Sequence, residues 1–308
     1  MSTSSKYLLA VLGALAPLAV VAQTTAPGIS CPVLFDGRIS YTTQPTDFDK
    51  NTSLYNPSYN LGQNQTWDQV ISFPPMVPSL FDIPSRTKSF EVTINDQSIF
   101  LPGGAPLEVG FRRSELMPAT NNGTDATVQG TTTFHWSMRT DLFKPLNYSH
   151  EYHPIWHETA DYSDSEFTLT LGTPFNASFD PTVHVPKTLR LAGRQSVSPE
   201  TTFFQVPFDD TVWHNWAVTI GWTTNTLSVW YSTDYEPLQL VAGPSFNNNT
   251  GGGDFHVGLM KEPTGPLGID VVHAGYQESG INEGLIYGGV FIENSANGCV
   301  TTSPYTSF

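Results

Sequence analysis

Short segments in which apolar and polar residues alternate recur along the whole chain, and they constrain its fold more than any other feature. The five clearest are TKSFEVTIND, TTTFHWSMR, SEFTLTLG, HNWAVTIGW and NTLSVWYS, at residues 87–96, 131–139, 165–172, 214–222 and 225–232. Threonine, β-branched and aromatic residues dominate these segments, which is typical of half-buried strands. The alternation therefore predicts an all-β protein.

Glycine and proline separate the predicted strands. The chain contains 25 Gly and 24 Pro, and after the first 22 residues no capped segment of ten or more residues shows a helical period. The Thr-Asn pair within GWTTNTLSVW predicts a hairpin turn between two strands. Many short strands in one chain of this length predict a two-sheet antiparallel β-sandwich of the jelly-roll type.

The N-terminus has the pattern of a secretory signal peptide. Lys6 precedes an apolar run over residues 7–22, which Pro17 interrupts and which ends in small residues. Such a run is too short for a comfortable membrane span and is typical of a signal cleaved after Ala22. We expect a secreted, extracellular chain in which residues 23–308 form a single domain, and we expect it to act as a monomer.

Glycosylation motifs and cysteines fit an extracellular protein. Six N-x-[ST] sequons predict N-glycosylation at Asn51, Asn64, Asn122, Asn147, Asn176 and Asn248. The two cysteines, Cys31 and Cys299, lie near opposite ends of the chain, and an oxidising compartment favours a disulfide bond between them. That bond would tie the N- and C-terminal segments together.

The charge balance limits the partners that this chain can have. There are 28 acidic against 13 basic side chains, and the formal net charge is −15 at pH 7. So acidic a surface repels nucleic acid and anionic membranes. A neutral partner is therefore expected.

The segment SHEYHPIWHE, residues 149–158, is the densest in titratable side chains. A zinc-protease helix requires His-Glu-x-x-His, whereas His150 and His153 are three residues apart and Pro154 would break a helix. No metal site is therefore predicted here. Strict strand alternation divides the segment into two polar faces, one with His150, Tyr152, Trp156 and Glu158 and the other with Glu151, His153, Ile155 and His157. At least one face should meet water or a ligand, although a solvated edge strand with incidental histidines would show the same pattern.

Two further segments carry polar groups that could serve a site. In LEVGFRRSELMP, Arg113 and Glu115 share one face of a strand, either as a surface ion pair or with Arg113 positioning a catalytic carboxylate or a sugar hydroxyl. In DTVWHNWAV, tryptophans flank His214, and aromatic faces of this kind can stack on pyranose rings. A histidine on a strand can equally be structural.

Taken together, eight blocks spread over the chain resemble glycoside hydrolase family 131, a family of secreted fungal β-glucanases with a β-jelly-roll fold. The blocks are CPVLFDGRIS, TQPTDFD, GFRRSEL, TFHW, NYSHEY with WHETADYS, VWHNWAV, FHVGLMKEP and YGGVFIEN. They occur in order along nearly the whole of the chain that follows the predicted signal.

The resemblance implies hydrolysis of β-1,3, β-1,6 and β-1,4 linkages in β-glucans by two catalytic glutamates, with a histidine in the same cleft. By motif, these residues are Glu115 in GFRRSEL, Glu151 in NYSHEY and His214 in VWHNWAV. Glu158 in WHETADY is the rival for the second carboxylate, and alternation places it on the face opposite Glu151. The resemblance favours an inverting mechanism.

Glycosidic cleavage needs one carboxylic acid and one carboxylate, and this inventory supplies both. We expect the substrate to be bound in an open groove by Arg113, His150, Tyr152, Trp136, Trp156 and Trp216. No organic cofactor and no catalytic metal are expected, since phosphate-binding loops, zinc-spaced cysteines and EF-hands are missing from the sequence. A structural calcium ion is left open.

Two other functions remain compatible with the sequence. A polysaccharide lyase on a similar jelly roll would need a basic groove to neutralise a uronate, and only Arg112, Arg113, Arg190 and Arg194 could build one. A non-catalytic glucan-binding lectin would keep the tryptophans and need no carboxylate pair.

Overall fold

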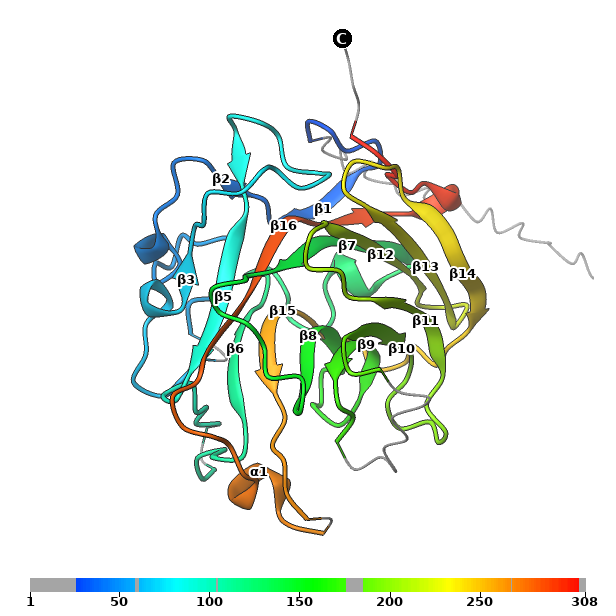
Figure 1. The fold of residues 1–308 in the computed structure, drawn as a ribbon. Helices are drawn as coiled ribbons and strands as arrows, with labels where there is room; N and C mark the ends of the chain where they lie inside the picture. Colours follow the sequence, from blue (N-terminus) through cyan, green and yellow to red (C-terminus); the bar gives the residue numbers. More distant parts are fainter. Residues whose placement is uncertain (1–25, 59–60, 104, 176–184, 267, 305–308) are drawn as a thin grey trace, which may run out of the picture.

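Two antiparallel sheets form the body of the molecule (Figure 1). The computed structural model describes residues 26–58, 61–103, 105–175, 185–266 and 268–304. The larger sheet has eight strands, in the order β14 (Gln239–Phe246), β13 (Thr226–Thr233), β12 (His214–Gly221), β7 (Thr131–Thr140), β16 (Asn282–Asn294), β5 (Phe90–Asn95) and β3 (Ile71–Ser72), with β1 (Val33–Asp36) also paired to β16. Its strand order is far from the chain order, as expected for a sandwich.

The second sheet has six strands and carries two of the three polar segments found in the sequence, those around residues 112–116 and 149–158. Its order is β11 (Thr202–Pro207), β10 (Thr188–Ala192), β9 (Ser165–Gly172), β8 (Glu151–Glu158), β15 (Asp254–Lys261) and β6 (Arg112–Leu116). A separate two-stranded ribbon joins β2 (Ile39–Ser40) to β4 (Thr87–Lys88). Helix is confined to α1 (Val271–Ala274) and four short 3₁₀ turns, η1 (Pro45–Asp47), η2 (Trp67–Gln69), η3 (Ala126–Val128) and η4 (Ala296–Gly298), within the described ranges.

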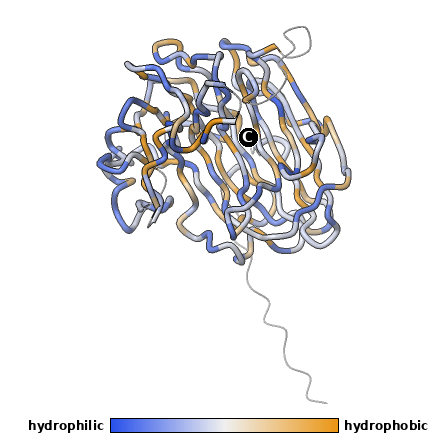
Figure 2. The backbone as a smooth tube through the Cα atoms, turned by 90° about the horizontal axis from the view of Figure 1, so that it is seen from below, coloured by the Kyte–Doolittle hydropathy of each residue, from blue (hydrophilic) through white to orange (hydrophobic). Residues whose placement is uncertain are grey.

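The core lies between the two sheets because each strand turns alternate side chains inward. In β12, Trp216, Val218 and Ile220 are fully buried in the main cluster, while Ala217 belongs to a second cluster that covers the outer side of the large sheet. Figure 2 shows apolar residues interleaved with polar ones along the packed strands, with many hydrophilic residues in the surrounding loops. The predicted two-sheet sandwich is confirmed.

Most predicted strands match the observed ones closely. The segments at 131–139, 165–172, 214–222 and 225–232 correspond to β7, β9, β12 and β13. Residues 87–96 instead form β4 and β5, which join different sheets on either side of Ser89. The predicted hairpin turn is present, and Asn225 at its tip has a φ of 51°, a conformation that asparagine tolerates better than most residues.

The disulfide bond predicted between Cys31 and Cys299 is confirmed, and it closes a separation of 268 residues. It joins the segment before β1 to the segment after β16, two strands that also pair with each other. The signal peptide predicted over residues 1–22 lies outside the described residues. Among those described, no helix is long and apolar enough to cross a bilayer.

Candidate active site

A β-bulge in β8 decides which of its side chains face outward. The register of β8 against both of its neighbours shifts between Tyr152 and Ile155, where Pro154 has no N–H to offer the ladder. Strict alternation is therefore wrong for this strand. The outward-facing residues on either side of the bulge are Glu151, His153, Trp156 and Glu158. Glu151 and Glu158, expected on opposite faces, lie on the same one.

Glu115 and Arg113 form a buried ion pair on β6. The Nε of Arg113 donates to Oε1 of Glu115 over 2.6 Å, and Nη2 donates to Oε2 over 3.3 Å. The Glu115 side chain has no exposed area, and Arg113 also contacts Glu108 at 3.4 Å. The predicted pairing of these two residues is confirmed, and burial makes it more than a surface contact.

The electrostatics connect Glu115 with Glu158. Burial raises the pKa of Glu115 to about 7, against the lowering effect of Arg113, and the nearby charges of Glu158 and Glu108 raise it further. The pKa of Glu158 is raised as well, mainly by burial. The charge of Arg113 opposes this rise, and the charge of Asp254 adds to it. Glu115 and Glu158 therefore lie within electrostatic reach of each other and share Arg113 as a neighbouring cation.

His256 on β15 lies beside Glu158. Together with Arg113, Glu115 and Glu158 it forms a cluster that we call the Glu115 group. The ring of His256 stacks on Trp156 at 4.5 Å between centroids and 11° between planes, and its Nε2 lies 3.5 Å from Oε2 of Glu158. Burial lowers the pKa of His256 well below its usual value, which favours the neutral imidazole. His256 carries no motif that marks it in the sequence, although alternation in DFHVGLM places it on the face opposite the apolar Phe255 and Val257.

A cavity of about 670 Å³ opens beside Arg113, the buried partner of Glu115, although Glu115 itself is not among its lining residues. Arg113, Glu158 and His256 line it together with Asp254 and Glu108. The remaining lining residues are of three kinds. They are the amides Asn56, Asn121 and Asn122, the small residues Pro102, Gly103, Gly123 and Ala160, and three larger side chains that could contact a sugar, Phe100, Met117 and Tyr162. The cavity thus combines carboxylates with groups able to bind hydroxyls.

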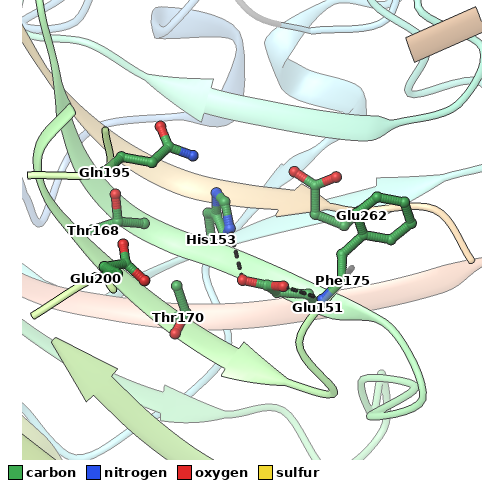
Figure 3. Close-up of a pocket in the computed structure, with 8 residues that line it drawn as sticks. All are labelled: Glu151, His153, Thr168, Thr170, Phe175, Gln195, Glu200 and Glu262. Atoms are coloured by element: carbon green, nitrogen blue, oxygen red, sulfur yellow. Dashed lines mark hydrogen bonds and ion pairs between the residues drawn. The ribbon is translucent and has the colours of Figure 1, made fainter. Parts of the chain in front are cut away.

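A second, smaller hollow of about 270 Å³ lies farther along the same face of the six-stranded sheet (Figure 3). Its lining residues come from β8, β9 and the adjoining loops: Glu151, His153, Thr168, Thr170, Phe175, Gln195, Glu200 and Glu262. His153 Nε2 lies 3.2 Å from Oε1 of Glu151, and the backbone N–H of Phe175 donates to the other oxygen. Glu151 therefore belongs to this hollow.

The charges of the second hollow act mainly on one another. The pKa of Glu262 is raised to about 7, mainly by burial. The charge of His153 opposes this rise, and the charge of Glu151 adds to it. Burial alone would lower the pKa of His153, but the hydrogen bond and charge of Glu151 raise it. Burial and the charge of Glu151 likewise raise the pKa of Glu200. The second hollow is therefore an acidic surface in its own right.

Three of the aromatic residues predicted to line the groove are in the interior instead. Trp136, Trp216 and Tyr152 have no exposed area, and the two indoles stack in parallel with their centroids 6.2 Å apart. The prediction that these rings contact substrate is wrong, because alternation identifies two faces of a strand but not which one is the core. Trp156 does lie on the outer face, although only 3% exposed beside His256.

The two predicted histidines lie away from the Glu115 group. His150 is buried, with Nδ1 2.7 Å from the carbonyl oxygen of Glu262 and Nε2 2.7 Å from Glu278, so its predicted contact with substrate is wrong. His214 is on β12 of the other sheet, where Nδ1 lies 2.7 Å from the Tyr231 hydroxyl and Nε2 lies beside Asp209. The structure does not bring His214 to the glutamates.

Comparison with known proteins identifies the family. Residues 33–298 match the glycoside hydrolase 131 catalytic N-terminal domain. The chain belongs to glycoside hydrolase family 131. No curated protein matches it.

Two solved structures of the family share the fold of this glycoside hydrolase. A GH131 β-glucanase catalytic domain from Podospora anserina is 24% identical with a TM-score of 0.66, over 88% of this chain and 98% of that one. The catalytic domain of the GH131 protein from Coprinopsis cinerea is 22% identical with a TM-score of 0.65, over 89% and 98%. An endo-β-1,4-glucuronan lyase from Trichoderma reesei is more distant, with 12% identity and a TM-score of 0.46.

Five of the six predicted glycosylation sites of this GH131 protein lie on its surface. Asn51, Asn64, Asn122 and Asn147 are exposed and Asn248 is partly exposed, while Asn176 lies outside the described residues. No group of three or more metal-ligating side chains converges within the described ranges. Glycosylation, and hydrolysis without a metal ion, stay predictions.

Proposed function

We propose that this GH131 enzyme hydrolyses β-glucans with Glu115 and Glu158 as its acid/base pair. The observation that carries this proposal is the shared environment of the two carboxyls: burial raises the pKa of each, and each is near Arg113. Two carboxyls that repel each other lose their protons in two steps. Over part of the acidic pH range the pair therefore holds one proton, as glycoside hydrolysis requires.

The chemistry needs both members of the pair. The protonated carboxyl donates its proton to the glycosidic oxygen as the bond from that oxygen to the anomeric carbon breaks. The ionised carboxylate takes a proton from a water molecule, whose oxygen bonds to the anomeric carbon. In this proposal the water attacks from the face opposite the leaving group, so the anomeric configuration inverts.

Acidic groups dominate both hollows, and this supports a neutral glucan as substrate. The arginines that a lyase would need are already engaged by other groups: Arg112 with the carbonyl of Phe111, Arg113 with Glu115, Arg190 with the carbonyl of Gly172, and Arg194 with Asp164. A uronate would meet carboxylates instead of a basic groove. Linkages of the β-1,3, β-1,6 and β-1,4 types are all within the proposal.

Single substitutions on the outer face test which glutamates react. We expect Glu115→Gln and Glu158→Gln each to lower kcat by at least about a hundredfold with the fold intact, the scale of a lost general acid or base. Glu151→Gln, a matched variant from the second hollow, should change KM more than kcat. Reducing ends released from laminarin, pustulan, lichenan and cellulose measure the rates, with circular dichroism to verify folding.

Two outcomes would count against this assignment. Full activity in Glu158→Gln with an inactive Glu151→Gln would make Glu151 the second carboxylate. An increase in ultraviolet absorbance during digestion of glucuronan would indicate elimination, because a lyase forms an unsaturated product and a hydrolase does not. Proton NMR of the first product formed reports its anomeric configuration and tests inversion.

A further inference from the structure

Tyr162 is a surface aromatic residue on the wall of the larger cavity. It lies in the turn between β8 and β9, four residues after Glu158, and it lines the same cavity as Glu158 and Arg113. Its side chain is 66% exposed, whereas Trp156 on the same sheet is only 3% exposed. Tyr162 is therefore both a lining residue of this cavity and far more accessible to a ligand than Trp156, the tryptophan that the sequence suggested.

The backbone at Tyr162 adopts a conformation that tyrosine rarely takes. Its φ is 58°, in the left-handed region that favours glycine and asparagine. Two hydrogen bonds close the turn, from the N–H of Tyr162 to the carbonyl of Thr159 (2.8 Å) and from the N–H of Thr159 to the carbonyl of Asp164 (2.9 Å). Strain of this kind is often retained where a side chain must point in a particular direction.

The turn is also attached to the neighbouring loop. The carboxylate of Asp164 accepts hydrogen bonds from the Arg194 side chain and from the backbone N–H and hydroxyl of Ser196. Within the turn, Asp161 accepts from Thr159 Oγ1 over 2.7 Å. These contacts fix the position of Tyr162 on an otherwise exposed turn, which lowers the entropy cost of using its ring for binding.

We propose that the ring of Tyr162 stacks on a glucosyl unit bound beside the cleavage site. An aromatic face suits the C–H face of a neutral pyranose, and the amides of Asn56 and Asn121 in the same cavity suit its hydroxyls. This inference rests on the proposed β-glucanase function. It assigns Tyr162 to recognition of the chain and not to the reacting atoms.

Three substitutions separate the ring from the backbone. Tyr162→Phe keeps the aromatic face, Tyr162→Ala removes it, and Tyr162→Gly removes it while relieving the positive φ. On whichever of laminarin, pustulan, lichenan or cellulose the wild type hydrolyses fastest, we expect Phe to leave KM within about twofold. Ala and Gly should both raise KM by about tenfold with much smaller changes in kcat. Tyr235→Ala is the matched control, since Tyr235 is 61% exposed and does not line the cavity.

Two results would overturn the inference. One is an unchanged KM in Tyr162→Ala, and the other is a KM that rises in Ala but returns to the wild-type value in Gly, because the backbone would then be the cause. If the wild type hydrolyses none of the polymers, the proposed function fails. Retardation in native gels containing laminarin then decides the inference alone: it stands if Tyr162→Ala is retarded less than wild type, and it falls if the two migrate alike.

Discussion

The ion pair of Arg113 and Glu115 shows two opposing effects on one carboxyl. Arg113 favours the ionised form of Glu115, while complete burial of the Glu115 side chain disfavours it. Burial is the larger effect, so the pKa rises despite a bidentate contact. A carboxyl of this kind can change protonation at the mildly acidic to neutral pH at which many hydrolases act.

His256 and His214 test whether a histidine must lie beside the proposed carboxyl pair to affect catalysis. His256→Phe keeps the stack on Trp156 but removes the nitrogen beside Glu158, and we expect kcat to fall by about tenfold, the scale of one lost polar contact to a charged group. It should also move the acidic limb of the pH profile of kcat. His214→Phe, on the other sheet, should lower the melting temperature and leave kcat within about twofold. Equal losses of kcat in the two variants would contradict this.

At the level of strands, the sequence predicted the fold better than the faces. Alternation found β7, β9, β12 and β13 because most of the length of each strand turns alternate apolar side chains into the core. The same rule failed in β8, where one bulge puts Glu151 and Glu158 on a common face. It also could not choose between the two sides of β7 and β12, so Trp136 and Trp216 were predicted to line the groove when they belong to the core.

Contacts between strands far apart in sequence were beyond such patterns. His256 and Glu158 meet because β15 and β8 pair, and Asp254 lies opposite Glu158 in that register. A single sequence contains no signal for that pairing. The resemblance of whole blocks supplied Glu115 and Glu151, with Glu158 as the rival for the second carboxylate, but their relative positions required the fold.

Gly258 on β15 is the residue directly opposite Glu115 on β6. A Cβ at Gly258 would lie 2.2 Å from the carbonyl oxygen of Ser114 and 2.5 Å from the Cα of Glu115. We expect Gly258→Ala to force the two strands apart, to destabilise the protein by about 1–3 kcal/mol as overpacking does, and to lower kcat. Thermal unfolding and initial rates measure both effects.

Gly103→Ala is the control for that substitution, because a Cβ there would meet no atom within 4 Å. Its melting temperature should equal that of the wild type. Because Gly103 lines the larger cavity, it serves as the control for stability only, and activity is compared with the wild type. If Gly258→Ala is as stable as Gly103→Ala and as active as the wild type, the tight approach of β15 to β6 is not what positions Glu115.

For the molecule as a whole, the shifted carboxyls predict a stability maximum near pH 4.5. Burial raises the pKa of Glu262 and Glu115 to about 7 from an ordinary value of 4.5. Between these values the folded state holds more protons than the unfolded state, so stability falls as pH rises. Burial raises the pKa of Glu278, but hydrogen bonds from Lys261 and Asn147 bring it down to about 2. Between pH 2 and 4.5 the unfolded state therefore holds more protons than the folded state, so stability falls as pH drops below 4.5.

Melting temperatures measured from acidic to neutral pH test this prediction. Glu262→Gln should flatten the decline above pH 4.5, and Glu278→Gln should flatten the decline below it. The net charge of −15 at pH 7 adds self-repulsion on the neutral side and so has the same sign. A melting temperature that increases steadily up to pH 7 would contradict the prediction.

The bond between Cys31 and Cys299 makes nearly the entire domain a covalent ring. One proteolytic cut in any loop between these residues opens the ring but releases no fragment, and the two sheets can still hold the strands together. A nicked molecule should therefore run as one band in a denaturing gel without reductant, as two bands with it, and keep its hydrolytic activity. In the Cys31→Ser variant, with Cys299→Ser to avoid a free thiol, the same cut should give two bands under both conditions.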